Sequence, residues 1–346
     1  MAFLSLVKNN YFLSYVQILM YSQFFFYFFY FFSFLQEEKA KIITDLKLVA
    51  DKVLVFVILL AFVELFLSDF FREFMALKHF DRGIGRFYLV SFFGSGPSLA
   101  NFTAIYLFLW HYYYYGLENK ITRKAKALLV MSVIICILSF SRKEVFLTFL
   151  FLIFFPYPGR SKIYLWIRRA ITFSTVLLGL FVYYQVFFST ANKVALSSKY
   201  VRWKIVDYSY TILSDNFPFG TGVGTFGSKM SLELDHIYRK YNVGPEMLGY
   251  KSTGRRGPIY DAFLFTFTTE IGIGILLFVC FFYLIYRCKP NIPNAFNTYI
   301  KRYIVFYVLL ISFFTPVLVN SFGFMVAGLL GAMCGNINLL RSTKNA

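Results

Sequence analysis

A series of apolar runs, each close to the length that crosses a bilayer, constrains this chain more than any other feature of its sequence. A helix needs about 20 residues to cross roughly 30 Å of hydrocarbon. Hydrophobic residues make up 58% of the 346 positions, which is more than ordinary soluble domains contain. The sequence therefore predicts an all-α polytopic membrane protein.

We predict about nine transmembrane helices from these runs. Their approximate ranges are 11–35, 53–71, 98–115, 127–140, 144–157, 170–188, 259–286, 303–319 and 322–340. No cleavable signal-peptide pattern is present, so we expect the first run to be retained as a span. The prediction divides the chain into residues 1–188 with transmembrane helices 1–6, a long polar loop 189–258, and residues 259–346 with transmembrane helices 7–9.

Lysine and arginine residues are unevenly distributed between the two sides that this topology defines. The richer side holds the connectors 36–52, 116–126, 159–169 and 287–302, together with Arg341 and Lys344. Short cytoplasmic segments carry an excess of Lys and Arg, so we predict that this side faces the cytoplasm. The long loop 189–258 is then exoplasmic.

The net charge of the chain is +18, which in a soluble protein would suggest a nucleic-acid ligand. Here the cations are scattered over short loops without a nucleic-acid-binding motif, so we expect no nucleic-acid partner. Membrane topology accounts for about half of them, and an anionic ligand is the better account of the rest. The exoplasmic loop is itself net basic, as a phosphate or pyrophosphate site requires. For any single loop cation, solvation is the simpler explanation.

Within that loop, the segment 202–224 combines an arginine with a glycine series. The guanidinium of Arg202 matches paired phosphate oxygens and stays charged at any relevant pH. Pro218 precedes Gly220, Gly222 and Gly224, which let the backbone bend tightly. Their spacing is GxGxG rather than GxxxxGKS, so a nucleotide P-loop is not indicated. We expect these four residues to shape the loop.

Two carboxylates and two further arginines are candidate site residues. Asp261 and Glu270 flank the start of the 259–286 run, where a carboxylate is costly unless it is used or paired. Arg142 lies in a turn too short to need two cations for solubility, and Arg86 precedes the third span. Arginines that converge from different hairpins would suit a pyrophosphate, although an even spread over the surface gives the same pattern.

Aromatic residues and cysteines are assigned to packing. Aromatic side chains make up 22% of the chain, which suits sugar stacking or contact with lipid, and we favour lipid. Cys136, Cys280, Cys288 and Cys334 lie in or beside apolar runs without metal-type spacing. We therefore expect neither a disulfide framework, nor a metal site, nor a cofactor.

Four pieces of the sequence, in this order, resemble the O-antigen polymerases and the related O-antigen ligases of bacterial envelopes. They are Arg86 followed by Gly94-Ser-Gly-Pro-Ser-Leu-Ala100; Ser141-Arg142; Arg202-Trp203 leading to Phe217-Pro-Phe-Gly-Thr-Gly-Val-Gly-Thr-Phe226; and Leu264 followed by Glu270 and Gly272. Ser98 stands where the family commonly has Asn, and Tyr260-Asp261 stands where ligases tend to have His-Asn. The missing histidine favours a polymerase over a ligase.

The resemblance implies glycosyl transfer at the periplasmic face of the bacterial inner membrane, in lipopolysaccharide biosynthesis. A glycan chain on undecaprenyl pyrophosphate would be transferred to a new lipid-linked repeat unit, without a metal. Arg142, Arg202 and Arg86 would bind the pyrophosphate, and Asp261 or Glu270 would activate the acceptor or orient an arginine. The implied partners are the undecaprenyl-pyrophosphate-linked oligosaccharide, membrane lipid and a chain-length regulator.

Other functions stay open at this point. An O-antigen ligase would join the polysaccharide to lipid A-core. A lipid-linked oligosaccharide flippase would also be basic and polytopic, but we would expect more spans and short loops on both faces. A chain-length regulator usually has few spans and long coiled-coil segments, and no heptad run is visible.

Overall fold

The computed structural model describes residues 11–34, 36–74, 89–157, 201–232, 236–243, 262–313 and 315–335, with isolated helical positions at 166, 170 and 174. These ranges are helical, joined by turns and short irregular segments, and no strand occurs within them. The prediction of an all-α chain is therefore confirmed for the described part.

The chain forms two compact units. The first comprises Met1–Tyr27, Leu178–Arg287 and Val305–Phe324, and the second comprises Phe28–Leu177, Cys288–Ile304 and Met325–Ala346. Helices α2 (Tyr11–Ser33), α13 (Ala295–Ser312) and α14 (Ser321–Met333) contribute residues to both units. The predicted division into 1–188, 189–258 and 259–346 follows membrane topology, whereas the two units follow contacts within the fold. The topology-based division stays a prediction.

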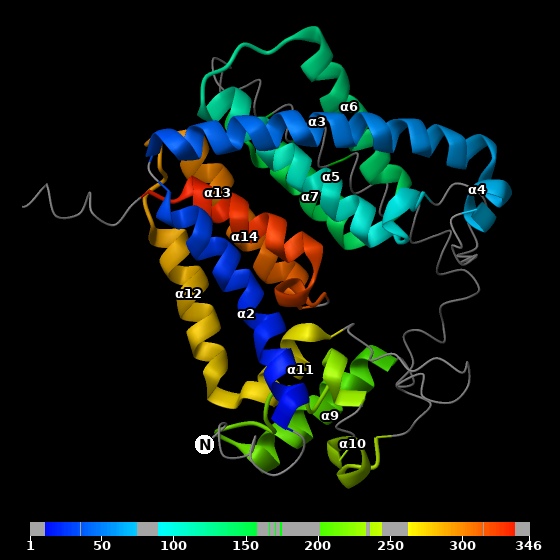
Figure 1. Ribbon diagram of the computed structural model, residues 1–346, viewed down its shortest axis with the longest axis vertical. Coiled ribbons are helices and arrows are strands. Elements are labelled where there is room, and N and C mark those ends of the chain that lie inside the picture. Colours follow the sequence, from blue (N-terminus) through cyan, green and yellow to red (C-terminus); the bar gives the residue numbers. More distant parts are fainter. Residues whose placement is uncertain are drawn as a thin grey trace, which may run out of the picture. The chain divides into compact units, whose positions relative to one another are not determined.

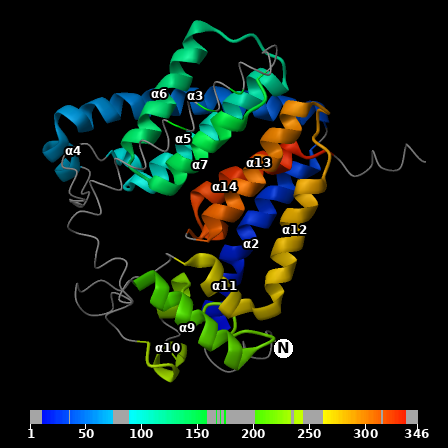
Figure 2. The same ribbon diagram turned by 180° about the vertical axis from the view of Figure 1, so that it is seen from behind.

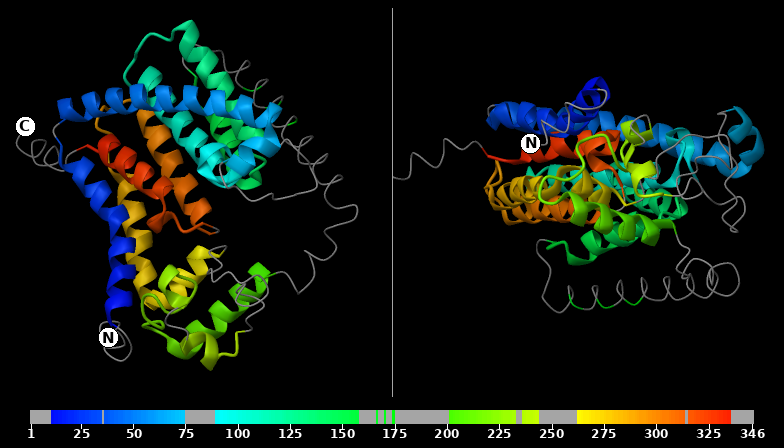
Figure 3. Two further views of the ribbon diagram at one scale, coloured as in Figure 1. Left: turned by 45° about the vertical axis from the view of Figure 1, so that its right-hand side comes forward. Right: turned by 90° about the horizontal axis from the view of Figure 1, so that it is seen from below.

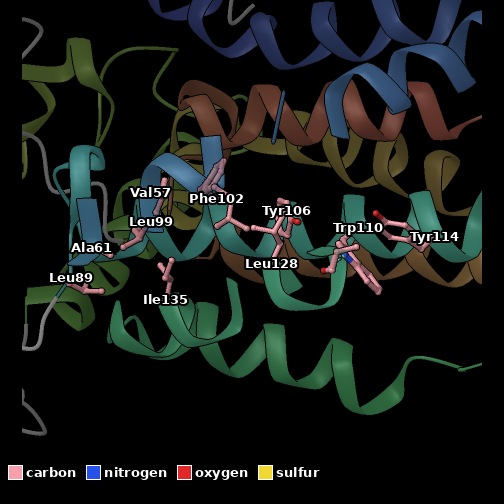
Figure 4. Packing of buried hydrophobic residues seen from close by; sticks show 12 residues of the cluster. Val57, Ala61, Leu89, Leu99, Phe102, Tyr106, Trp110, Tyr114, Leu128 and Ile135 are labelled. Carbon is pink, nitrogen blue, oxygen red and sulfur yellow. Dashed lines mark hydrogen bonds between the residues drawn. The ribbon is translucent and has the colours of Figure 1, made fainter. Parts of the chain in front are cut away.

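The second unit is built around α5 (Gly96–His111), of which nearly every residue is buried. Ser95 caps this helix by accepting a hydrogen bond from the Ser98 amide at 3.3 Å, and Pro97 lies in its first turn. Figure 4 shows its side chains between α3 (Gln36–Phe66) and α6 (Arg123–Leu138). The Trp110 indole donates to the Ala125 carbonyl at 3.0 Å, which links α5 to α6.

The rest of the second unit consists of short helices. They are α4 (Ser68–Phe74), η2 (Ser91–Phe93), the π-helical turn η3 (Tyr112–Gly116) that continues α5, and α7 (Arg142–Phe154). The predicted spans 98–115, 127–140 and 144–157 coincide with α5, α6 and α7 to within a few residues at most ends. Long apolar runs place helices directly, which is why this part follows from the sequence.

The predicted connector 36–52 differs, because the structure folds it into the first half of α3. Two of its four lysines, Lys39 and Lys47, are buried, whereas Lys41 and Lys52 are exposed. The Lys39 ammonium donates to the Cys334 carbonyl at 2.9 Å, and the Lys47 ammonium contacts the Asp51 carboxylate at 2.6 Å. The partner of Lys39 is distant in sequence, and that of Lys47 is one helical turn away, so protein groups satisfy charges that the sequence alone assigned to water.

The first unit contains α2 up to Tyr27, helices within the predicted loop 189–258, and helices that follow it. These are α9 (Val201–Asn216), η4 (Lys229–Leu232), α10 (His236–Lys240), α11 (Phe263–Ile271), η5 (Gly272–Gly274), α12 (Ile275–Arg287), the second half of α13, η6 (Val317–Val319) and the start of α14. Helices α2 and α12 lie side by side (Figures 1 and 3). Their rings interlock, with Phe25 and Phe281 at 4.8 Å and Phe24 and Phe282 at 5.7 Å.

Two helical segments of the described part are long and apolar enough to cross a membrane, namely Phe12–Ser33 and Phe263–Arg287. Of the most apolar stretch of each segment, only 28% and 33%, respectively, is buried inside the protein. That exposure is compatible with membrane association. The predicted span 170–188 lies outside the described residues apart from positions 170 and 174, and the nine-span topology stays a prediction.

Candidate functional site

The predicted site residues fall into three groups. Asp261 and Arg86 lie outside the described residues. Arg142 is the first residue of α7 in the second unit, and Arg202 lies in the first turn of α9 in the first unit; the side chains of both lie outside the described part. Glu270 and the predicted loop residues are fully described. They all belong to the first unit, where they form one site.

The loop that follows α9 docks against the C-terminal end of α11 through backbone hydrogen bonds. The Thr221 amide donates to the Thr269 carbonyl, and the Gly222 amide donates to the Glu270 carbonyl, each at 2.9 Å. In return, the Ile273 amide donates to the Pro218 carbonyl at 2.8 Å. The last carbonyls of a helix lack partners within the helix, so this loop serves as the cap of α11. Helices α9, α10 and α11 gather around it (Figures 1 and 2).

Two glycines make this close approach feasible. Gly220 has a φ of +73°, and a Cβ atom there would lie 2.6 Å from the carbonyl oxygens of Thr269 and Glu270. Gly272 has a φ of +56°, and its Cβ would overlap the Pro218 carbonyl oxygen. The two glycine-containing motifs therefore require glycine because their backbones touch each other.

The Glu270 carboxylate lies in the centre of this contact and is fully buried. Its Oε1 accepts a hydrogen bond from the Phe226 amide at 3.0 Å, and its Oε2 accepts one from the Tyr21 hydroxyl at 2.9 Å. The Tyr21 ring packs edge-on against Phe267, with centroids 4.9 Å apart. Glu270 thus joins the loop, α11 and α2.

Helix α9 is fixed to α11 by a second polar contact. The Thr269 hydroxyl donates to the Ser209 carbonyl at 3.2 Å, and both residues are buried. Ile205, Ser209 and Ile212 form the buried face of α9. Position 202 precedes Ser209 by seven residues, nearly two helical turns, so its backbone lies in register with this face.

Helix α10 supports the far side of the loop through Tyr238. The Tyr238 hydroxyl accepts from the Gly227 amide at 2.7 Å, contacts the Ser231 hydroxyl at 2.8 Å, and its ring lies 5.3 Å from that of Phe226. Burial raises the pKa of Tyr238 to about 12. The hydroxyl therefore stays neutral at physiological pH, which suits its role as a partner of the Gly227 amide.

The outer surface of the loop is aromatic. Phe217 and Phe219 are 66% and 46% exposed, and Tyr210 on α9 is 76% exposed. Exposed rings next to a helix that is able to cross a membrane suit contact with headgroups, lipid or sugar. Arg239 and Lys240 are exposed on α10, so this unit also presents cations to its surroundings.

In the second unit, a buried carboxylate organises the turn that carries Arg142. Glu144 is fully buried, accepts a hydrogen bond from the Ser141 hydroxyl, and lies 3.6 Å from the Lys143 ammonium. The Ser-Arg-Lys-Glu sequence has the spacing of a capping box, but the Ser141 hydroxyl bonds to the Glu144 carboxylate and makes no side-chain hydrogen bond to the backbone of α7. Whether Arg142 and Arg202 converge on one ligand stays a prediction, since they belong to different units.

Sequence reasoning missed three partners of the site, Tyr21, Phe226 and Tyr238. Tyr21 is 249 residues from Glu270 in the chain and sits in a run where tyrosine and phenylalanine are frequent. A signal for the docking itself was present, because both the 218–224 and the 270–274 motifs contain glycines that permit close backbone approach. Within the described residues, no group of three or more His, Cys, Asp or Glu side chains could hold a metal ion.

A comparison of the chain with models of known protein families gives no match, and a comparison with curated protein sequences also gives none. The fold and the site define the class of this protein. It is a helical protein with segments able to cross a membrane, in which a loop docks around a buried carboxylate.

Proposed function

We propose that this chain is a membrane glycosyltransferase that polymerises repeat units of O-antigen or a related surface polysaccharide. The observation that carries the proposal is the docking of the 216–228 loop on α11. Two of the sequence pieces that resemble the polymerase and ligase family, Pro218-Phe-Gly-Thr-Gly-Val-Gly224 and Glu270-Ile-Gly272, are separate in the chain and adjacent in the fold. Glu270-Ile-Gly272 lies within Phe263–Arg287, a segment long and apolar enough to cross a membrane, and the loop docks on it there. A lipid-linked substrate would present its head group beside such a segment.

In this proposal the protein is a multi-pass protein of the bacterial inner membrane with nine spans, and the 189–258 loop faces the periplasm. An acceptor hydroxyl on a lipid-linked repeat unit attacks the anomeric carbon of the growing chain. The bond between that carbon and the phosphate oxygen breaks, and undecaprenyl pyrophosphate leaves. The reaction needs cations that stabilise the pyrophosphate charge and a base that takes the acceptor proton.

Arginines supply the cations in this scheme. Arg142 and Arg202 bind the pyrophosphate, and Arg86 assists them. A guanidinium group can donate two parallel hydrogen bonds to the oxygens of one phosphate. The position of Arg202 in register with the buried face of α9 supports its assignment to the α11 site. Since guanidinium groups carry the charge, the proposed reaction is metal-independent.

The two carboxylates take different roles. Glu270 is enclosed and already accepts two hydrogen bonds, which fits a positioning residue that holds the loop. Asp261 is the proposed base for the acceptor hydroxyl. A glutamine at 270 can accept from the Phe226 amide and donate to the Tyr21 hydroxyl oxygen, whereas leucine can do neither.

The arginine assignment is tested in a strain that lacks the chromosomal copy, with Arg202→Ala, Arg142→Ala and the control Arg123→Ala. Arg123 is an exposed residue at the start of α6 on the predicted cytoplasmic side. Loss of a charge-assisted contact of about 1.5–3 kcal/mol lowers chain extension by roughly 10- to 150-fold. We expect short polysaccharide ladders for the first two variants and a normal ladder for the control. Normal ladders from both site variants, at wild-type protein level, would refute the assignment.

The role of Glu270 is tested by comparing Glu270→Gln with Glu270→Leu in the same strain. We expect glutamine to retain most of the polymerisation and leucine to lose it together with the stability of the loop. If Glu270 were the base, glutamine would abolish polymerisation in a protein of normal stability.

The deletion strain itself separates the alternatives. One repeat unit on lipid A-core indicates a polymerase. Lipid-linked polymer with none on the core indicates a ligase, and lipid-linked units that stay on the cytoplasmic face indicate a flippase. Either of the last two patterns would overturn the proposal.

A further inference from the structure

Two cysteines that are 46 positions apart meet in the second unit. The segment that follows α12 runs antiparallel to the end of α14, with a bridge between Pro290 and Cys334. The Asn291 amide donates to the Met333 carbonyl at 2.8 Å, and the Gly335 amide donates to the Lys289 carbonyl at 2.9 Å. This pairing places the Cys288 side chain beside the end of α14, where its sulfur lies 3.8 Å from the carbonyl oxygen of Gly335, the residue after Cys334.

The two sulfurs differ in exposure. Cys288 is partly exposed at the end of the segment, whereas Cys334 is fully buried. A reagent in water therefore reaches Cys288 first. Redox-sensitive pairs use this arrangement, in which an exposed cysteine reacts first and a second cysteine beside it then forms the disulfide.

Two lysines surround the pair. The Lys301 ammonium donates to the Cys288 carbonyl at 2.5 Å, and the Lys39 ammonium donates to the Cys334 carbonyl at 2.9 Å. Both lysines are fully buried, so water screens their charges little. The neighbouring Cys334 thiol lowers the pKa of the Cys288 thiol, and the positive charges of Lys301 and Lys39 lower it further.

We propose that Cys288 and Cys334 form a reactive dithiol site, in which a peroxide oxidises Cys288 and Cys334 then closes a disulfide. The Cys288 thiolate attacks one peroxide oxygen, the O–O bond breaks, and a sulfenic acid and hydroxide form. The Cys334 sulfur attacks the Cys288 sulfur, the S–O bond breaks, and the disulfide forms with release of water. Hydroxide takes up the proton that Cys288 lost, so two thiols and one hydrogen peroxide give one disulfide and two waters.

The site is independent of the proposed polymerase activity. By the predicted orientation the 287–302 connector faces the cytoplasm, where thiols are kept reduced and a dithiol of this kind is available to peroxide. Closure would tie the segment after α12 covalently to the segment after α14.

The test uses the full-length protein in membranes, treated with hydrogen peroxide, then alkylated and digested for mass spectrometry. We expect a peptide pair linked through Cys288 and Cys334 in the wild type and in Cys280→Ser, which removes the exposed cysteine two turns earlier on α12. In Cys334→Ser we expect a sulfenic acid at Cys288 that dimedone traps. Absence of the linked pair in treated wild type, or its loss in Cys280→Ser, would overturn the proposal.

A second measurement tests the reactivity of Cys288 without relying on a cysteine variant. At pH 6 an ordinary thiol is ionised to about 0.3%. A Cys288 thiol that is largely ionised at this pH reacts on the order of 10-fold faster, because its lower intrinsic nucleophilicity offsets part of the gain in thiolate. We expect Cys288 in the folded protein to react with iodoacetamide about 10-fold faster at pH 6 than in the denatured protein, and Lys301→Met to reduce this difference. Equal rates in folded and denatured wild type would contradict the site.

Discussion

Replacement of Gly220 by alanine tests the docking of the loop on α11 most directly. The residue has a φ of +73°, which costs an L-residue roughly 1–2 kcal/mol, and its new Cβ would lie 2.6 Å from two backbone oxygens. Relief of that overlap requires the loop to move away from Thr269 and Glu270. The two amide-to-carbonyl bonds at this contact are then weakened, at about 0.5–1.5 kcal/mol each. Together these terms predict a loss of about 2–5 kcal/mol in docking free energy.

The matched control is Gly274→Ala, in the 270–274 motif on which the loop docks. Gly274 lacks a left-handed φ, and its Cβ would meet nothing closer than the Ile271 Cβ at 3.5 Å, an ordinary contact. Alanine at such a position is neutral or stabilises by about 0.4–1 kcal/mol. The two substitutions add the same methyl group and differ only in what that group meets.

Trypsin cleavage after Arg239 or Lys240 measures the opening of the loop. Both residues lie in α10, whose Ile237 and Tyr238 pack with Phe226 of the loop, so cleavage requires the loop to open. A loss of 2 kcal/mol raises the open fraction roughly 25-fold, and cleavage rises with it when closing is faster than cleavage. We expect this for Gly220→Ala and a wild-type rate for Gly274→Ala. Equal rates in all three proteins would show that the contact does not hold the loop.

Three further predictions concern the same site. Tyr21→Phe removes one donor to Glu270 and should lower the thermal midpoint in detergent by the equivalent of about 1 kcal/mol, with Tyr15→Phe, an exposed tyrosine on the same helix, as the control; equal midpoints for the two would contradict it. The raised pKa of Tyr238 means that its folded form keeps the proton, so its contribution is complete below about pH 10 and is lost as pH rises through about 12. Tyr238→Phe should therefore be less stable at pH 8, because the Gly227 amide loses its acceptor, and should show a smaller loss between pH 10 and 12; identical pH profiles would refute this. Polymerisation in washed membranes should be unchanged by a chelator, and activity lost with chelator and restored by a divalent cation would contradict the metal-independent scheme.

Helix positions followed from the sequence wherever an apolar run was long and free of charge, as in α5 and α6. The 36–52 segment did not follow, because its lysines indicated solvent while the fold buries Lys39 against the Cys334 carbonyl. The same limit applies to Cys288 and Cys334, which composition assigns to packing and which the 288–291 and 333–335 pairing brings together. Contacts between residues that are hundreds of positions apart leave no local pattern to detect.

The site shows the same division between local and long-range information. Gly220, Gly222 and Glu270 were candidates from local chemistry alone, since glycine permits close approach and a carboxylate beside a span needs a partner. What each approaches was not encoded locally. The structure gives the partner in each case as another part of the protein, namely the end of α11 for the glycines and the Phe226 amide and Tyr21 hydroxyl for Glu270.

That result changes which residues bear on function. A glycine or carboxylate whose contacts are all internal explains how the loop is held, and many folds need such a device whatever they bind. The arginines have a different role in the proposed function, because a guanidinium recognises a planar, paired anion such as the substrate pyrophosphate. If the proposed function is correct, substitutions at Gly220 and Glu270 act through the loop and lower stability and activity together. Substitutions at Arg142 and Arg202 should lower activity alone, so the ratio of the two effects separates the scaffold of the site from its chemistry.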